Sequence, residues 1–344
     1  MTNFLSHNEI LSQYVSMDKT LDLMLENAAS LREFFTGGND IVFIGCGSSY
    51  WMSLSAHKTM KLKTGRRTYA IKAGDVVLCP EEFTELYNNP VFVCPSRSGR
   101  TQEVLDAIGI LKDKYPDAKI FSVIIYSGSI LGEKSDMTLN IPWANEESVC
   151  QTRSFSNLYV AFTALGAILG NDNEFTDDLK KYIKSASKLY RRDDEIIKSI
   201  ANPGEITSVV TLGGGLQYGI VVEGAYIVVE MAEFSSNYYQ LLEYRHGPIA
   251  TAGKGTAVFI CAGMSDEHER KMAGEIRATG AKVYAVAAEK VDWADHTFSM
   301  DEDHSKESIA LYFAFIMQSF AYHFSVARGK NPDSPGNLPR YIMY

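Results

Sequence analysis

Two short loops rich in glycine and hydroxyl residues carry the clearest chemistry in this sequence. GCGSS (45–49) and SRSGRT (96–101) each follow a β-rich run and precede a helical one. Hydroxyl groups and backbone N–H groups at the start of a helix are donors that bind anions. The second loop also places two arginines in a chain whose formal net charge is −9. We therefore predict that the loop 96–101 binds a phosphate group.

Two other interpretations of these loops, a helix cap and a dinucleotide-binding loop, account for fewer of their residues. A Ser/Thr helix cap accounts for one residue of the loop 96–101 but not for the set. The loop 45–49 lacks a complete Gly-x-Gly-x-x-Gly pattern because Tyr50 follows the serines, and no acidic residue ends a strand ~20 residues later. A nicotinamide cofactor is therefore not expected. The corresponding loop 261–266 lacks the hydroxyl set, so the two halves are not predicted to be equivalent sites.

A glutamate pair and a histidine form a third constellation. Glu223 and Glu230 are seven positions apart in VVEGAYIVVEMAEF, on one face of a predicted helix. A buried carboxylate costs several kcal/mol unless it is paired or functional, roughly as for other buried charges; the alternative is an acid on a solvated edge. His246 precedes Gly-Pro, which predicts a loop position. A Glu/His pair can move protons at neutral pH.

Alternating strands and helices must position these residues. Runs at 41–45, 91–95, 119–125 and 137–142 are typical of buried strands, and 48–65 has helical spacing with a closing glycine. Helices of this length between strands predict a parallel sheet with right-handed crossovers.

The second half repeats this plan. The runs that begin at 41, 91, 119 and 138 have counterparts at 209, 257, 282 and 297, so the offset drifts only from 168 to 159 residues. We therefore predict an α/β fold of two tandem doubly wound (flavodoxin-like) parallel-sheet domains. A charged helical segment, 176–200, separates the two halves. The predicted boundaries are 1–175 for the first domain, 176–328 for the second and 329–344 for a C-terminal tail.

Composition narrows the class of protein further. The acidic balance argues against nucleic acid as a partner, and the apolar stretches are much shorter than the ~20 residues that span a bilayer. The N-terminus has no secretory pattern, and the five scattered cysteines are typical of a reduced protein, so a cytoplasmic location is expected. The proline-rich tail, 330–344, is either a frayed terminus or a functional segment.

At these residues the sequence resembles the SIS (sugar isomerase) family of phosphosugar enzymes over nearly its whole length. The loops 45–50 and 96–101 resemble the family's glycine/serine loop and its Ser-x-Ser-Gly-x-Thr phosphate loop. The segments 223–230, 246–248 and 333–338 resemble the isomerase half of glucosamine-6-phosphate synthase, whose tail folds over its site.

The departures from that synthase narrow the implied function. No glutaminase domain precedes the sugar-binding part, so glutamine-dependent amidation is not expected. Where the synthase has a lysine between the two helix glutamates, this chain has Ile227. Where the synthase has Ala-Lys near its end, this chain has Pro339-Arg340. Retention of Glu230 and His246 is similar to the fructosamine-6-phosphate deglycases, in which such a pair transfers protons.

The resemblance implies an enzyme that cleaves a 6-phosphorylated fructosamine to glucose 6-phosphate and a free amine, without a metal or organic cofactor. Glu230 would act as acid and His246 as base, and Arg97 and Arg100 would meet an amino-acid carboxylate. A homodimer or larger assembly with shared sites is implied, with a small phosphosugar as the partner and no membrane. The implied substrate-binding residues are Gly47, Ser48, Ser49, Ser96, Arg97, Ser98, Thr101, Glu223 and Arg340.

Two alternatives remain open. An aminosugar-phosphate isomerase/deaminase would use the same loops and proton couple, and a sugar-phosphate sensor would bind without turnover. A metal site in 301–304 (DEDH) is an alternative to an acidic surface turn. Different amines, either assignment of acid and base, and several assemblies are compatible with these residues.

Overall fold

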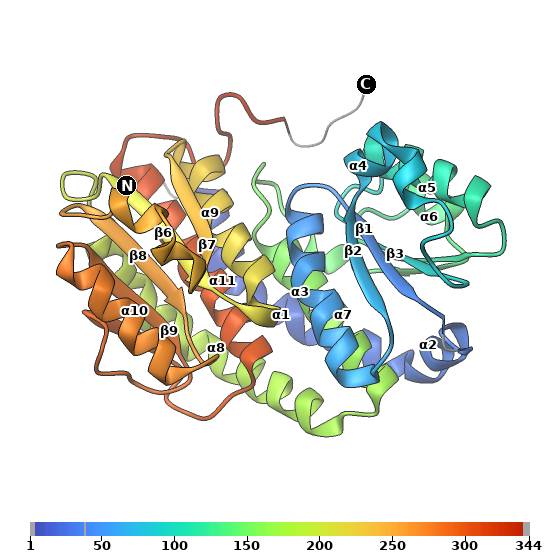
Figure 1. Ribbon diagram of the computed structural model, residues 1–344, viewed down its shortest axis with the longest axis horizontal. Coiled ribbons are helices and arrows are strands. Elements are labelled where there is room, and N and C mark those ends of the chain that lie inside the picture. Colours follow the sequence, from blue (N-terminus) through green and yellow to red (C-terminus); the bar gives the residue numbers. More distant parts are fainter. Residues whose placement is uncertain (1–3, 38, 340–344) are drawn as a thin grey trace. The chain divides into compact units, whose positions relative to one another are not determined.

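The computed structural model describes residues 4–37 and 39–339, which form two compact units (Figure 1). The first unit is built from Val15–Glu146 and Arg153–Lys180, with Pro339. The second is built from residues 4–14, Glu147–Thr152 and Lys181–Leu338. The helices α1 (Leu5–Glu26) and α8 (Asn173–Ile200) therefore contribute residues to both units. The predicted boundary at residue 175 divides the chain at a single point, whereas each of the two units is built from several separate segments.

The first unit contains a five-stranded sheet in the order β2-β1-β3-β4-β5, and every pairing is parallel. Its strands are β1 (Ile41–Gly45), β2 (Thr68–Lys72), β3 (Val91–Ser96), β4 (Lys119–Ile124) and β5 (Met137–Asn140). Its helices are α2 (Ala28–Phe34), α3 (Ser48–Thr64), α4 (Ala73–Leu78), α5 (Gln102–Lys114), α6 (Ile130–Lys134) and α7 (Arg153–Gly170).

Alternation along the buried strands places helices on both faces of this sheet. Val42 and Ile44 belong to a core that includes apolar residues of α4 and α5. Phe43 points to the other face, where its ring meets Phe162 of α7 edge-on at 5.5 Å between centroids. Because parallel strands are buried on both faces, these runs read as continuously apolar in the sequence.

The second unit repeats the topology with the order β10-β9-β8-β6-β7, again fully parallel. Read from the other edge, it matches the first sheet strand for strand, which confirms the predicted pair of doubly wound domains. Its strands are β6 (Ser208–Gly213), β7 (Ser236–Gln240), β8 (Thr256–Cys261), β9 (Lys282–Ala287) and β10 (His296–Ser299). Its principal helices are α9 (Tyr218–Ala232), α10 (Asp266–Ala278) and α11 (Lys306–Ala327).

Helices α9 and α11 pack closely on one another within this unit (Figure 1). A Cβ atom at Gly224 would lie 2.8 Å from the ring of Phe313 and 2.9 Å from Cγ of Met317, so only glycine permits this approach. Among the described residues, α11 alone is long and apolar enough to be a candidate membrane span, yet 94% of its apolar window is buried. It is therefore the core helix of the second unit.

Two edge strands, β2 and β7, were not predicted from the sequence. β2 and β7 each pair with one neighbour only, and their sequences, TYAIK and SNYYQ, are half-buried rather than continuously apolar. Edge strands of this kind carry a weak apolar signal because one side and part of one face remain near solvent.

The start of the C-terminal tail is anchored in the second unit. The Asp333 carboxylate accepts hydrogen bonds from the backbone N–H groups of Leu5 and Ser6, both at 2.8 Å, in the first turn of α1. Lys330 pairs with Glu233 at 2.6 Å. Tail residues up to Gly336, whose backbone N–H bonds to Glu233 at 3.3 Å, are thus held by specific polar contacts rather than frayed. Arg340 lies outside the described residues.

Candidate functional site

The first predicted loop follows β1 and opens α3. Gly47 takes the N-cap position with a φ of +52°, a conformation that favours glycine. At Gly45 a Cβ would lie 2.8 Å from the backbone nitrogen of Tyr50, so the strand can meet the helix this closely only without a side chain. Ser48 and Ser49 therefore stand in the first turn of α3, at the end of the helix that attracts anions.

The second predicted loop follows β3 and opens α5. Ser96 accepts a hydrogen bond from the backbone N–H of Gly99 at 2.9 Å, and Ser98 accepts one from that of Arg100 at 3.2 Å. Since both oxygens act as acceptors here, each hydroxyl keeps its own proton to donate to an anion. Thr101 is the N-cap of α5 but makes no side-chain capping bond, so the helix-cap interpretation does not account for it.

The sheet topology brings these two loops together. β1 and β3 are parallel neighbours, and the chain leaves β1 towards β2 on one side before returning to β3 on the other. Ligands of doubly wound sheets bind beyond the carboxyl ends of strands at such a switch point. The topology therefore places the loop with Gly47, Ser48 and Ser49 and the loop with Ser96, Ser98 and Thr101 at the carboxyl ends of adjacent strands of the first sheet.

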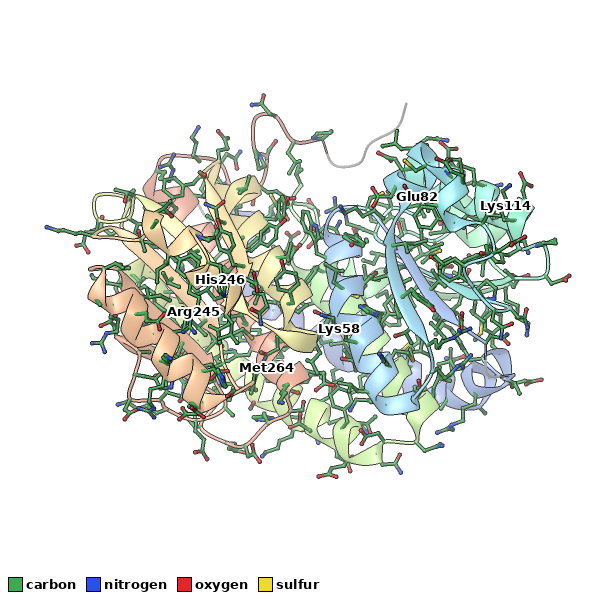
Figure 2. All side chains as sticks on the ribbon, in the orientation of Figure 1. Lys58, Glu82, Lys114, Arg245, His246 and Met264 are labelled. Carbon is green, nitrogen blue, oxygen red and sulfur yellow. The ribbon has the colours of Figure 1, made fainter. Side chains whose placement is uncertain are left out.

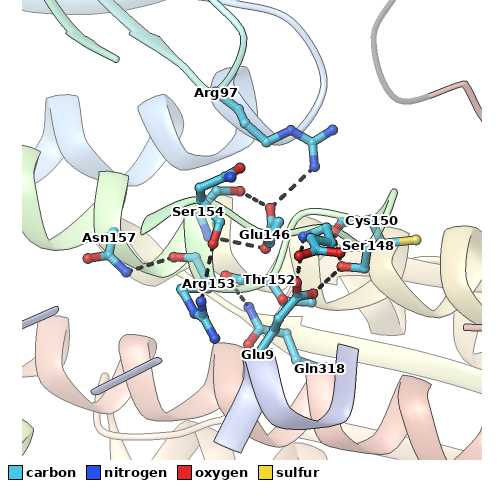
Figure 3. A network of polar contacts seen from close by, with 12 residues as sticks. Glu9, Arg97, Glu146, Ser148, Cys150, Thr152, Arg153, Ser154, Asn157 and Gln318 are labelled. Atoms are coloured by element: carbon cyan, nitrogen blue, oxygen red, sulfur yellow. Dashed lines mark hydrogen bonds and ion pairs between the residues drawn. The ribbon is translucent and has the colours of Figure 1, made fainter. Parts of the chain in front are cut away.

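The two arginines of the second loop differ in their surroundings. Arg97 is 6% exposed, and its guanidinium pairs with the fully buried Glu146 at 3.2 Å (Figure 3). Glu146 also accepts hydrogen bonds from the side chain and backbone N–H of Ser154, at the start of α7. Arg100 is exposed. The buried pair thus anchors the loop, and nothing in the sequence spacing identified Glu146 as its partner.

Cys46, in the first loop, is not an activated nucleophile. Burial, together with the charge of Glu103, raises the pKa of its thiol to about 11. A thiol with this pKa is almost entirely protonated at neutral pH, and only the thiolate is a strong nucleophile. The loop therefore offers donors for an anion rather than a covalent catalyst.

The glutamates lie on α9 in the second unit, as predicted. Glu223 is 2% exposed, so its carboxylate is not on a solvated edge. Glu230 is half-buried. Burial, a hydrogen bond with Tyr238 and then the charge of Glu230 raise the pKa of Tyr226, one turn earlier on the same helix. The charge of Glu230 thus acts on the phenol of Tyr226.

His246 lies in the loop that follows β7, the next strand after α9 (Figure 2). It ends a short 3₁₀ helix, Glu243–Arg245, and its backbone N–H bonds to the carbonyl of Glu243 at 3.0 Å. The side-chain oxygen of Gln240 accepts bonds from the N–H groups of Leu242 and Glu243 at 2.8 and 3.0 Å, which fixes the loop to the end of β7. The imidazole is exposed.

A cavity of about 470 Å³ lies between α9 and β7 in the same unit. Its lining is aromatic and polar, and sequence reasoning did not identify it. Three tyrosines from two elements converge there, and Tyr226 connects it to the surroundings of Glu230. The lining residues are Ala225, Tyr226, Val229, Ser236, Asn237, Tyr238 and Tyr239.

The acidic turn 301–304 does not gather as a metal site. Asp301 pairs with Arg192, and Glu302 pairs with Lys181 at 2.6 Å. Within the described ranges, the cluster with metal-ligand geometry lies elsewhere, at His7, Asp194 and His323. The acidic surface turn is therefore the better description of 301–304.

Together, these features define a class of protein: a tandem doubly wound α/β protein with a hydroxyl-rich loop beyond the strands of its first sheet. No family model matches the chain. Curated relatives include glutamine–fructose-6-phosphate aminotransferases, 26% identical over 330 residues in Sulfolobus acidocaldarius and 24% over 358 residues in Shewanella oneidensis. These matches take in 95% and 97% of this chain but 53% and 58% of the relatives, so the chain spans little more than half their length.

Solved structures resemble the chain over almost its entire length. The glucosamine-6-phosphate deaminase of Thermotoga maritima has 28% identity and a TM-score of 0.84, with 98% of this chain and 99% of that one covered. The tagatose-6-phosphate ketose/aldose isomerase of Escherichia coli has a TM-score of 0.88 at 19% identity over 98% and 96% of the two chains, which bears on the fold alone. In sequence and in fold, the chain is thus similar to proteins that act on sugar phosphates, in keeping with its resemblance to the SIS (sugar isomerase) family.

Proposed function

We propose that this protein is a fructosamine-6-phosphate deglycase, which releases glucose 6-phosphate and a free amine. The observation that carries the proposal is the placement of Glu230 on α9 and of His246 on the loop after the following strand. One carboxylate and one imidazole on consecutive elements are the groups that a proton transfer between adjacent carbons requires. Ile227 stands between the two helix glutamates, so no amine from this helix competes for the sugar carbon.

The reaction needs two proton transfers at carbon, a proton exchange at O2 and at nitrogen, and one water. His246, as base, removes a proton from C1 of the ketoamine; the C1–H electrons form the C1–C2 double bond, and the C2 carbonyl oxygen takes up a proton to give an enaminol. Glu230, as acid, donates a proton to C2, and loss of the N–H proton to solvent leaves an imine between C1 and nitrogen. Water adds at C1 and the C–N bond breaks, which yields the aldose phosphate and the amine. No redox step or organic cofactor enters this sequence.

The loops of the first unit are proposed to hold the phosphate. Hydroxyl protons of Ser96, Ser98 and Thr101, with those of Ser48 and Ser49, would donate to the phosphate and sugar oxygens. Glu223 and Arg340 remain proposed substrate-binding residues. Proton transfer at C1 and C2 would still be confined to Glu230 and His246.

The proposed contact with the amine's carboxylate is better suited to Arg100 than to Arg97. Arg97 is buried and paired with Glu146, whereas Arg100 is exposed on the same loop. We propose that Arg97 positions the loop and that Arg100 meets an acidic substituent. In Arg100→Ala, KM should rise for fructosamines of amino acids and stay unchanged for fructosamines of simple alkylamines.

An aminosugar-phosphate isomerase/deaminase is the second candidate. It is favoured by the likeness to the glucosamine-6-phosphate deaminase of Thermotoga maritima, which extends over 98% of this chain. That activity would use the same proton couple but would release ammonia from an aminosugar phosphate. The choice between the candidates therefore depends on the substrate and not on the site residues.

The deciding experiment measures glucose 6-phosphate with a coupled assay on 6-phosphorylated fructosamines of several amino acids. Glu230→Gln keeps the size of the side chain but removes the acid, and it should lower kcat by about 10²- to 10⁴-fold. Glu267→Gln, on the exposed face of α10, is the matched control and should leave kcat unchanged.

Each result points to one function. Glucose 6-phosphate released by the protein and lost in Glu230→Gln supports the deglycase. Ammonia or ketose phosphate from glucosamine or galactosamine 6-phosphate, with no turnover of fructosamines, would replace it by the isomerase/deaminase. Tight phosphosugar binding without turnover, and unchanged in Glu230→Gln, would indicate a sensor.

A further inference from the structure

Three potential metal ligands converge in the second unit, on elements that play no part in the proposed reaction. His7 comes from the first turns of α1, Asp194 from α8 and His323 from α11. Nε2 of His7 lies 2.9 Å from one carboxylate oxygen of Asp194, and Nε2 of His323 lies 2.9 Å from the other. All three donor atoms lie within 4.8 Å of one another.

The cluster is enclosed and its rings are held in place. The exposed fractions of the His7, His323 and Asp194 side chains are 22%, 9% and 6%. The ring of His7 stacks on Tyr322 with centroids 4.4 Å apart and planes within 2° of parallel. His323 meets the same imidazole edge-on at 5.3 Å. The donor nitrogens are thus directed by packing and not only by the carboxylate.

Asp194 is held as a buried carboxylate. Ser319 donates a hydrogen bond to it at 2.7 Å, on the oxygen that also faces His323. Both carboxylate oxygens of Asp194 thus face donor atoms inside the unit. Buried charges in proteins are paired or bind metals, so this carboxylate is a suitable anionic ligand.

We propose that His7, Asp194 and His323 form a structural binding site for a divalent transition-metal ion such as Zn²⁺. Two imidazole nitrogens and one carboxylate oxygen are the ligand types that this class of ion prefers. Tetrahedral bonds of about 2.1 Å place donor atoms about 3.4 Å apart. The two imidazole–carboxylate distances of 2.9 Å would therefore open by about 0.5 Å, and the widest pair would close by about 1.4 Å at most. The hydrogen bond from Ser319 to Asp194 is the kind of outer contact that orients a metal-bound carboxylate.

The ion would join three helices at the root of the C-terminal segment. His7 directly follows Leu5 and Ser6, whose backbone N–H groups are held by the Asp333 carboxylate. A metal bond to His7 would fix the first turn of α1 and, through it, the segment around Asp333. The proposed ion stabilises this junction and takes no part in the proton transfers of the proposed function.

The test uses the full-length protein, stripped with EDTA and dialysed. Titration calorimetry with Zn²⁺ should give one equivalent bound, and Co²⁺ should give the visible d–d bands of nitrogen and oxygen coordination. Zn²⁺ at 100 times its Kd should raise Tm by about 4 °C. Amide exchange should slow in residues 4–10 and around Asp333.

The variants His7→Asn and Asp194→Asn should abolish both the bound equivalent and the Tm shift. His7→Asn removes the most exposed ligand and so disturbs the core least. His268→Asn is the control, because this histidine is exposed on α10 and bonds only to Ser265 among the described residues. It should bind Zn²⁺ as the unaltered protein does.

The proposal fails if the unaltered protein binds no equivalent of Zn²⁺ and shows no Tm shift, since the cluster would then be a hydrogen-bonded triad. It also fails if His7→Asn retains the full Zn²⁺ response. Because these readouts are independent of sugar turnover, their outcome is separate from that of the deglycase assay.

Discussion

The loop after β3 and the loop after β8 have the same place in the strand topology of their units, but their chemistry is opposite. In the first unit, the loop after β3 presents the hydroxyls of Ser96 and Ser98 at the start of α5. In the second unit, the loop after β8 meets the carboxylate of Glu269, which accepts the backbone N–H groups of Gly263, Met264 and Ser265 at 3.2, 2.7 and 3.1 Å.

Glu269 therefore occupies the place that an external anion would take. It is 2% exposed, and the cavity left at this crevice is about 130 Å³. The helix N-terminus of α10 already has its negative charge from the chain itself. The comparison teaches that a duplicated fold can lose a possible anion site when one of its own carboxylates binds the backbone N–H groups of the loop. Four predictions follow from this difference, in decreasing order of effect.

Gly99→Ala should have the largest effect. The new Cβ would lie 2.1 Å from the hydroxyl of Ser129, at a φ of +61°. The phosphate loop must shift, so we expect KM for the phosphosugar to rise by about 100-fold or more, with a lower Tm. The matched change in the other loop is Gly263→Ala, which has the same kind of backbone strain at a φ of +99°, but whose Cβ meets only the end of Ile309 at 3.1 Å. Equal KM effects in both variants would break the comparison.

Ser98→Ala should weaken phosphate binding more modestly. Loss of one hydrogen bond to a charged group costs about 1.5–3 kcal/mol, so KM should rise by roughly 10- to 100-fold while kcat changes little. Ser265→Ala, in the loop after β8 of the second unit, should leave both constants unchanged. Steady-state kinetics of the two variants, with inorganic phosphate as a competitive inhibitor, checks the assignment. An unchanged inhibition constant in Ser98→Ala would contradict it.

Glu269→Ala should affect folding stability and not sugar binding. Three backbone N–H groups lose their acceptor, so the free energy of unfolding should fall by about 2 kcal/mol. Inorganic phosphate should restore part of the loss if the emptied cradle accepts an external anion. Chemical denaturation with and without phosphate measures both effects, and the exposed Glu267→Ala serves as the control. A large rise in KM would show that the second crevice takes part in the site.

The smallest effect concerns the thiol beside the first crevice. With a pKa of about 11 instead of the ordinary 9.0, Cys46 has about 100-fold less thiolate at pH 8 than an unperturbed cysteine. Alkylation by iodoacetamide should accordingly be slow at pH 8 and accelerate as pH rises towards 11. Peptide mass spectrometry follows the reaction at this residue. Rapid modification at pH 7 would mean that the loop is more open than its burial indicates.

Much of the fold was predictable because buried parallel strands are continuously apolar. Runs such as 41–45 and 91–95, and their counterparts in the second half, mark the central strands by composition alone. The edge strands β2 and β7 were not predictable in this way, because half of their surroundings is solvent or loop. The hydroxyl loop 96–101 was identifiable since its donors are contiguous in the chain.

The sequence by itself determined the local chemistry of this protein: two glycine-turned loops with hydroxyl donors, a helix with two glutamates and a histidine before Gly-Pro. Only the tertiary structure decided which charges meet. The pairing of Arg97 with Glu146, the filling of the second cradle by Glu269 and the convergence of His7 with Asp194 depend on chain crossings that no local spacing records. Burial makes each of these contacts important for stability, because a charge removed from water needs a partner within the fold.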